Sequence, residues 1–240
     1  MKFIQKNLWF IIFIGLLFMV DPLYAGPGGA VAKGLFKTFW GKILISVIAI
    51  ILLPVILYIY FVEYINVRKN KRILQKIGLK HKNFSWLELN KEFSNIIRRV
   101  YIAWENEDMS EVNQYVNHWY WQNQQKVFLD YWKKNNLKNI SKLKVLDKIN
   151  PLYIELTNDD NLNGSKIAVL IKVDAEDYLV EIGTNKIVEG VKGYQNLEYI
   201  WIFEYTNGKW LLGDIQESTL SLGFAKMQNV IPVNLQSTTA

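Results

Sequence analysis

A long apolar run near the start of the chain is the most regular feature of its hydrophobic pattern. Residues 43–62 form twenty consecutive positions without a charged side chain. A helix rises about 1.5 Å per residue, so this run covers about 30 Å, which matches the hydrocarbon core of a bilayer. Pro54 lies inside the run, and membrane helices tolerate such a proline as a kink. The pattern therefore predicts one transmembrane helix over residues 43–62.

A shorter apolar run, residues 8–20, precedes it and differs in kind. It follows two lysines, and the helix-breaking Pro22 and the small Ala25 come after it. A basic start, a short apolar centre and a small final residue are typical of a signal peptide, here residues 1–25. An uncleaved first helix is the alternative, although thirteen residues are short for a span. Residues 26–42 then form a short extracytoplasmic segment.

The charges that flank the long run predict its orientation. Three Lys lie in residues 26–42 just before it, whereas seven Lys or Arg lie in residues 63–83, a predicted basic juxtamembrane linker. Cytoplasmic flanks are enriched in basic residues, so we expect the folded part in the cytoplasm, on one helix in a bacterial inner membrane. This holds whether or not the signal peptide is cleaved. Topology alone explains the basic run, and contact with anionic lipid headgroups is a second role for Arg68, Lys69, Lys71 and Arg72.

An amphipathic helix is predicted after Ser85. Ser85 is a favourable N-cap, and Glu88 three residues later completes the sequence of a capping box. Apolar residues then recur at spacings of three and four, which marks one buried face. They are Trp86, Leu89, Phe93, Ile96, Ile97, Val100 and Trp104. Two shorter helices are expected next, one from Ser110 and one over about residues 122–134. The first turns Val112, Tyr115, Val116 and Trp119 inward, and the second carries Val127, Phe128, Tyr131 and Trp132.

After residue 139 the hydrophobic period changes from helical to alternating. Strand-like alternation covers residues 143–149, 152–156, 166–181, 197–205 and 210–215. Asn150-Pro151 is expected to form a bend or bulge, and Asn207-Gly208 is the signal of a type I′ hairpin. Helices followed by antiparallel strands predict an α+β fold, with the helices packed on a curved antiparallel sheet.

Charge and composition limit the chemistry that this chain can perform. Residues 64–99 contain ten Lys or Arg and two Glu, whereas residues 100–240 contain thirteen basic and eighteen acidic residues. The distal part is therefore acidic, which argues against nucleic acid as a partner. The chain has no Cys, and neither of its two His has a second ligand at metal-binding spacing. No metal site and no cofactor is predicted.

Two carboxylates are candidates for catalysis. Asp177 and Asp214 fall on or near predicted strands, where an Asp base beside a Tyr donor in an apolar pocket could transfer a proton. Neither belongs to a set of converging titratable groups, and solvated positions suit both better. An enzyme is therefore not expected, and proton transfer by Asp214 or Asp177 stays the alternative.

The stretch 100–112, followed by a curled sheet, resembles the Tim44-like domain family of the NTF2-like superfamily. The positions that fit are Trp104, Asp108 and Trp210. The resemblance covers about residues 84–222 and leaves 223–240 as a C-terminal tail. It implies an NTF2-like cone of helices on a curved sheet, and a tethering or scaffolding role at a membrane rather than catalysis. The VirB8-like assembly components of type IV secretion are also similar, although their domain faces the periplasm.

The expected function is therefore a membrane-anchored scaffold that binds a protein partner or lipid. It would use an aromatic-lined concave face, whose candidate side chains are Trp104, Trp119, Tyr178, Trp201, Tyr205 and Trp210. A small-molecule binder or an isomerase-type enzyme that uses the cone is the competing class.

Overall fold

The computed structural model describes residues 38–235, and of Lys42 the backbone alone. The predicted signal peptide, residues 1–25, and most of the segment 26–42 lie outside the described residues. The chain divides into two compact units, Met1–Phe61 and Val62–Ala240.

One long helix, α3 (Phe39–Ile77), contains the predicted span and continues beyond both of its ends. Among the described residues, it is the one helix that is long and apolar enough to cross a membrane. Large apolar side chains in its first part are exposed, among them Leu44, Ile51 and Leu57. Water is an unfavourable surrounding for so long an apolar surface, and a bilayer is a favourable one.

The segment predicted as a basic linker, residues 63–83, is instead helical up to Ile77 and packs into the domain. Ile73, Leu74 and Ile77 are buried in the main hydrophobic core. The buried Asn70 lies one helical turn before Leu74, on the same side of α3. The basic residues occupy the rest of the helix surface. Because they alternate with Ile73, Leu74 and Ile77 in the sequence, the short apolar face that packs on the domain is not obvious from the pattern.

Helix α4 (Trp86–Glu105) confirms the predicted N-cap. The Ser85 hydroxyl accepts a hydrogen bond from the backbone N–H of Glu88. In place of the reciprocal half of a capping box, the backbone N–H of Ser85 donates to Lys82 O at 3.0 Å, in the 3-10 turn η1 (Lys82–Phe84). The predicted apolar side chains that are fully buried are Leu89, Phe93, Ile96, Ile97 and Val100.

The prediction of a helix that starts at Ser110 is wrong. A single 3-10 turn forms there, η2 (Met109–Val112), and the chain then runs beside the strand β4 (Lys209–Glu217). The backbone N–H of Asn117 donates to Leu212 O at 2.8 Å. Backbone groups that pair with a strand edge are not available to a helix, so tertiary pairing overrides the local helical pattern.

The helix predicted over residues 122–134 forms as three short pieces. They are α5 (His118–Gln122), the π-helix η3 (Asn123–Leu129) and α6 (Asp130–Lys134). Trp119, expected to point inward, is 61% exposed on α5, and Val127 on η3 is exposed as well.

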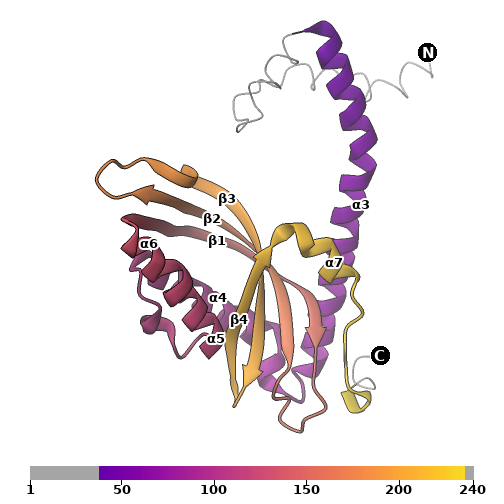
Figure 1. The fold of residues 1–240 in the computed structure, drawn as a ribbon. Helices are drawn as coiled ribbons and strands as arrows, with labels where there is room; N and C mark the ends of the chain where they lie inside the picture. The colour runs from indigo at the N-terminus through magenta and orange to yellow at the C-terminus, as the bar shows by residue number, and fades with distance from the viewer. Residues whose placement is uncertain (1–37, 236–240) are drawn as a thin grey trace, which may run out of the picture. The chain divides into compact units, whose positions relative to one another are not determined.

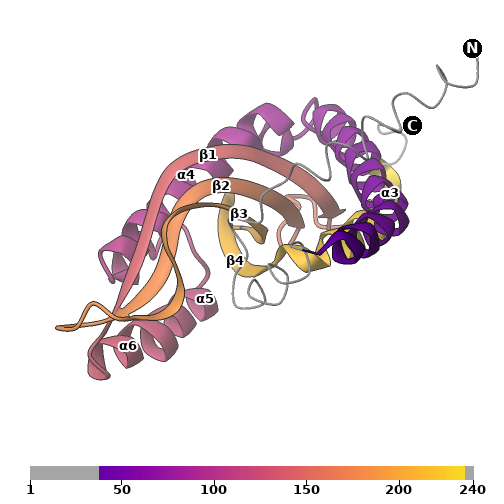
Figure 2. The same cartoon turned by 90° about the horizontal axis from the view of Figure 1, so that it is seen from above.

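Four antiparallel strands form one sheet, in the order β1 (Leu137–Glu155), β2 (Lys166–Glu181), β3 (Ile187–Thr206) and β4. β1 continues through Asn150-Pro151, and the predicted bulge is a register shift between Pro151 and Tyr153. Further register shifts accompany the strong bending of the strands in Figure 2. The predicted hairpin is confirmed, with positive φ angles at both Asn207 and Gly208.

Helices pack on both faces of the sheet (Figure 1). On one face, Phe93 of α4 stacks on Phe203 of β3, with 3.9 Å between ring centroids. Alternation along β3 turns Ile200 to the other face, where it packs with Phe224 of α7 (Ser221–Lys226) and Val67 of α3. The α+β fold, with helices on a four-stranded antiparallel sheet, is therefore confirmed.

The predicted C-terminal tail, residues 223–240, packs on the domain up to the last described residue. Ala225 is buried on α7. The backbone N–H of Val230 donates to Ile154 O at 3.0 Å, and Leu235 is buried. This segment therefore extends the edge of β1 instead of leaving the domain.

Candidate membrane-surface site

A groove of about 750 Å³ lies between the end of α3 and the segment that follows α7. Its lining residues are Tyr64, Ile65, Arg68, Lys69, Arg72, Ile73, Lys76, Gln228, Asn229 and Ile231. Asn229 fixes the position of the segment after α7, which forms one side of the groove. Its side-chain amide donates to Asn70 Oδ1 at 2.7 Å, and its Oδ1 accepts from the backbone N–H of Ile154 at 3.0 Å. We call this feature the basic groove.

Three of the four predicted lipid contacts line the basic groove together: Arg68, Lys69 and Arg72. None of these three forms an ion pair with another described residue. Arg68 Nη1 donates to the Tyr64 hydroxyl at 3.1 Å, and its guanidinium carbon lies 5.4 Å from the centre of that ring. The described lining residues include no carboxylate, and Arg68, Lys69 and Arg72 give the groove a positive charge.

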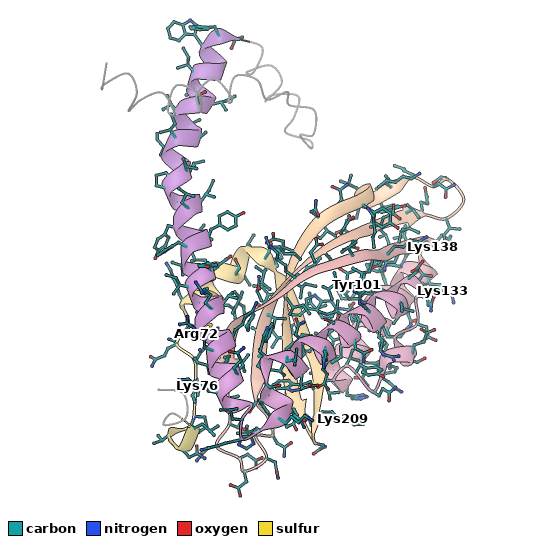
Figure 3. All side chains as sticks on the ribbon, turned by 180° about the vertical axis from the view of Figure 1, so that it is seen from behind. Arg72, Lys76, Tyr101, Lys133, Lys138 and Lys209 are labelled. Carbon is teal, nitrogen blue, oxygen red and sulfur yellow. The ribbon has the colours of Figure 1, made fainter. Side chains whose placement is uncertain are left out.

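Lys71, the fourth predicted contact, lies on another side of α3. Its Nζ donates to Asn150 Oδ1 at 3.4 Å and lies 5.2 Å from the centre of the Trp86 ring. Lys76, which is not among the predicted lipid contacts, also lines the groove (Figure 3). Its spacing of four residues from Arg72 is the signal that identifies it, because such positions share one helix face.

The aromatic residues predicted for a concave binding face do not form one surface. Trp201 and Trp210 are 0% and 1% exposed, and Tyr205 is also buried. The Trp210 ring lies 5.5 Å from Phe93 of α4, and its Nε1 donates to Asn83 O at 3.1 Å. These three side chains stabilise the core and offer no contact surface to a partner.

The other three aromatic candidates lie apart from one another. Trp104 is partly buried against Trp201, with 5.9 Å between ring centroids. Trp119 is exposed on α5. Tyr178 lines a different cleft, between α6 and the first three strands.

The two candidate carboxylates are on different strands and have different partners. Asp214 in β4 accepts from the backbone N–H of Ile215 at 2.9 Å and from Gln216 Nε2 at 3.0 Å. Asp177 in β2 accepts from the Tyr199 hydroxyl at 3.0 Å. The residues 38–235 also hold no group of three His, Asp or Glu side chains placed to bind a metal ion.

These features define a class of protein: an α+β domain, with helices on a four-stranded antiparallel sheet, that follows one helix able to span a membrane. No protein-family model matches the chain, and no curated protein matches it either. Among solved structures, the chain is similar to the intermembrane space region of the chloroplast protein ARC6. The TM-score is 0.39 and the sequence identity 7%, over 53% of this chain and 96% of that one. A likeness of this size carries no argument about family or function.

Proposed function

We propose that this protein is a non-enzymatic membrane anchor that holds a binding domain at the cytoplasmic face of a bacterial inner membrane. Residues 1–25 act as its signal peptide, α3 supplies the single span, and the domain tethers a protein partner. In this proposal the domain is an NTF2-like cone of the Tim44-like family. The pattern of residues 100–112 and the bent antiparallel sheet support that assignment.

The positive charge that Arg68, Lys69 and Arg72 give to the basic groove is the observation that carries the proposal. Arg68 lies six residues after Val62, the last residue of the apolar run, which is about 9 Å along the helix. Arg and Lys side chains reach towards headgroups while their stems stay on apolar surface. Each basic residue held near an anionic bilayer surface contributes about 1 kcal/mol. Arg68, Lys69 and Arg72 therefore suit the phosphate groups of anionic lipids.

The absence of a converging catalytic set supports the non-enzymatic part. Asp177 accepts from the Tyr199 hydroxyl at 3.0 Å, whereas Asp214 accepts from Gln216 and the backbone N–H of Ile215, so the two carboxylates do not share one site. Tyr199 is the one acid or base that hydrogen-bonds to either carboxylate in the described chain. A proton-transfer site needs such groups around one reacting atom.

Native mass spectrometry of the full chain in neutral detergent tests the lipid contact. Phosphatidylglycerol and phosphatidylcholine are added in turn, and the lipids retained per protein are counted. We expect preferential retention of phosphatidylglycerol by the natural sequence. The triple variant Arg68→Gln, Lys69→Gln, Arg72→Gln should lose that preference, because its groove is neutral except at Lys76.

Lys71→Gln is the matched control, since Lys71 is on the same helix but faces the domain. It should keep the preference for phosphatidylglycerol. Equal retention of both lipids by the natural sequence would contradict the proposed lipid contact.

A further inference from the structure

The cations of the basic groove form a row that is long for a single phosphate group. Arg68, Arg72 and Lys76 all line the groove and follow one another along α3 at a spacing of four residues. Such positions share one helix face, and each step adds about 6 Å along the axis. The row therefore extends about 12 Å, whereas a charge-assisted hydrogen bond to a phosphate oxygen is only about 2.7–2.9 Å long.

The far end of the row lies beyond the headgroup layer of a bilayer. About 30 Å of hydrocarbon within a total of about 40–45 Å leaves a headgroup layer of about 5–7 Å on each side. In the proposed anchor the hydrocarbon ends near Val62. Arg68 follows at about 9 Å along the helix, Arg72 at about 15 Å and Lys76 at about 21 Å. A helix tilt of about 20° shortens these distances by less than about a tenth. The headgroup phosphate of an ordinary lipid is therefore level with Arg68 and not with Lys76.

The two sides of the groove are fastened together without any ligand. The Asn66 side-chain amide donates to Ala225 O, and the Asn229 amide donates to Asn70 Oδ1 at 2.7 Å. Asn66 and Asn70 are one helical turn apart on α3, so the segment after α7 is held at two successive turns. A site that is already formed costs little to order when a ligand binds.

The end of the groove nearest the apolar run suits a lipid. Tyr64 and Ile65 line it, and Ile65 is exposed. The Tyr64 hydroxyl accepts from Arg68 Nη1, which orients the guanidinium and leaves its other N–H groups for a phosphate. An amphipathic ring beside an apolar side chain is typical of the boundary between hydrocarbon and headgroups.

We propose that the basic groove binds an anionic lipid whose headgroup carries a second negative group, further from the bilayer than its bridging phosphate. Arg68 and Lys69 contact the bridging phosphate, and Arg72 and Lys76 contact the distal group. A lipid with a phosphorylated sugar or inositol as its headgroup has this chemistry. The groove volume of about 750 Å³ is within the range of sites that hold a whole small molecule. The inference rests on the proposed membrane anchor and names the class of lipid that its groove selects.

Native mass spectrometry with two matched lipids tests the inference on the full chain in neutral detergent. Phosphatidylinositol 4-phosphate is the probe, and phosphatidylinositol is its match without the distal phosphate. We expect the natural sequence to retain the probe at least about fivefold more strongly, because a basic residue near an anionic group contributes about 1 kcal/mol. Thermal melting of each variant below checks that it folds.

Three variants separate the two ends of the groove. Arg72→Gln should lower the ratio of probe to phosphatidylinositol about fivefold. Arg68→Gln should weaken the retention of both lipids by a similar factor, because both carry the bridging phosphate. Lys71→Gln is the matched control, since it removes a charge from the same helix outside the groove, and it should keep the ratio.

Three results would overturn the inference. Equal retention of the two inositol lipids by the natural sequence would mean that the groove reads one phosphate only. An equal fall of the ratio in Lys71→Gln would mean that total charge alone attracts the probe. Displacement of the probe by an equal concentration of soluble inositol 1,4-bisphosphate would mean that the ligand is a free phosphate compound and not a lipid.

The preference for phosphatidylglycerol over phosphatidylcholine is measured on the same samples. If it persists while the two inositol lipids are retained equally, the inference is wrong and the proposed lipid contact still stands. If that preference is absent as well, the proposed lipid contact fails with the inference.

Discussion

The buried side-chain amide of Asn70 donates to the main-chain carbonyl of Leu152 at 2.8 Å, which fastens α3 to the edge strand β1. The same amide lies 3.1 Å from Pro151 O, beside the register shift in β1. The contact also fixes how α3 is turned about its axis. It directs Lys71 to the domain, and Arg68 and Arg72 to the basic groove.

Replacement of Asn70 should therefore destabilise the domain. Asn70→Leu removes the side-chain donor to the buried carbonyls of residues 151 and 152 and the side-chain acceptor of the Asn229 amide. We expect the free energy of unfolding to fall by about 1–3 kcal/mol, measured by chemical denaturation of the full chain in mild detergent. Asn95→Leu is the control, since Asn95 is exposed on α4 and accepts from Arg99. Equal stability of the two variants would show that the α3–β1 contact contributes nothing.

Two buried tyrosines should respond in opposite ways to loss of the hydroxyl. The Tyr120 hydroxyl is buried without a hydrogen-bond partner among the described residues, whereas the Tyr205 hydroxyl accepts from Asn83 Nδ2 at 3.0 Å. Tyr120→Phe should leave the free energy of unfolding unchanged or raise it by up to about 1 kcal/mol, because it removes an unsatisfied polar group. Tyr205→Phe should lower it by about 1 kcal/mol. Denaturation curves of both variants measure the difference, and a larger loss in Tyr120→Phe is the contrary result.

Gly78 forms the tight turn between α3 and the start of α4. A Cβ at Gly78 would lie 2.4 Å from Ser85 Cβ and 2.6 Å from Ser85 Cα. Backbone atoms cannot move aside cheaply, so Gly78→Ala should lower the free energy of unfolding by about 1–3 kcal/mol. In contrast, Gly223→Ala in α7 meets no atom within 4 Å and should be neutral or slightly stabilising. Thermal melting compares the two, and a tolerated Gly78→Ala would mean that the turn has room.

Desolvation by the surrounding protein raises the pKa of Asp177, although the hydrogen bond from Tyr199 opposes the shift, and this predicts a pH dependence of stability. Its carboxyl is protonated more readily in the folded than in the unfolded chain, where the ordinary value is 3.8. The folded state therefore loses stability as pH rises from that value through the raised pKa. Asp177→Asn lacks this loss, so its melting temperature relative to the natural sequence should rise from about pH 4 to about pH 7. A constant difference across this range would show that the pKa is not raised.

Local patterns predicted much of this fold because local interactions determine those parts. The uncharged run at 43–62, the N-cap at Ser85 and the Asn207-Gly208 turn each depend on a few neighbouring residues. The segment after Ser110 was mispredicted because its backbone pairs with Leu212, about a hundred positions later. No local pattern includes that partner.

The candidate sites were harder to predict for the same reason. Asn70 lies within the basic run, but the carbonyls to which it donates are about eighty residues away in the sequence. The sequence pattern of this packed helix is therefore easily mistaken for that of a linker. Once the buried side of α3 is known, the four-residue spacing places Arg68, Arg72 and Lys76 on one helix face. Lys71 then lies on a different face. Trp201 and Trp210 stand in alternating strands whose inner face α4 covers, and alternation does not tell a core from an open face.

Cysteine accessibility tests most directly whether the anchored domain faces the cytoplasm. The natural sequence has no Cys, so Lys209→Cys at the exposed hairpin turn provides one reactive thiol without background. In intact cells a membrane-impermeant maleimide should leave this thiol unlabelled, and it should label the thiol once the inner membrane is permeabilised. Labelling of Lys209→Cys in intact cells would place the domain outside the cytoplasm and contradict the proposed anchor.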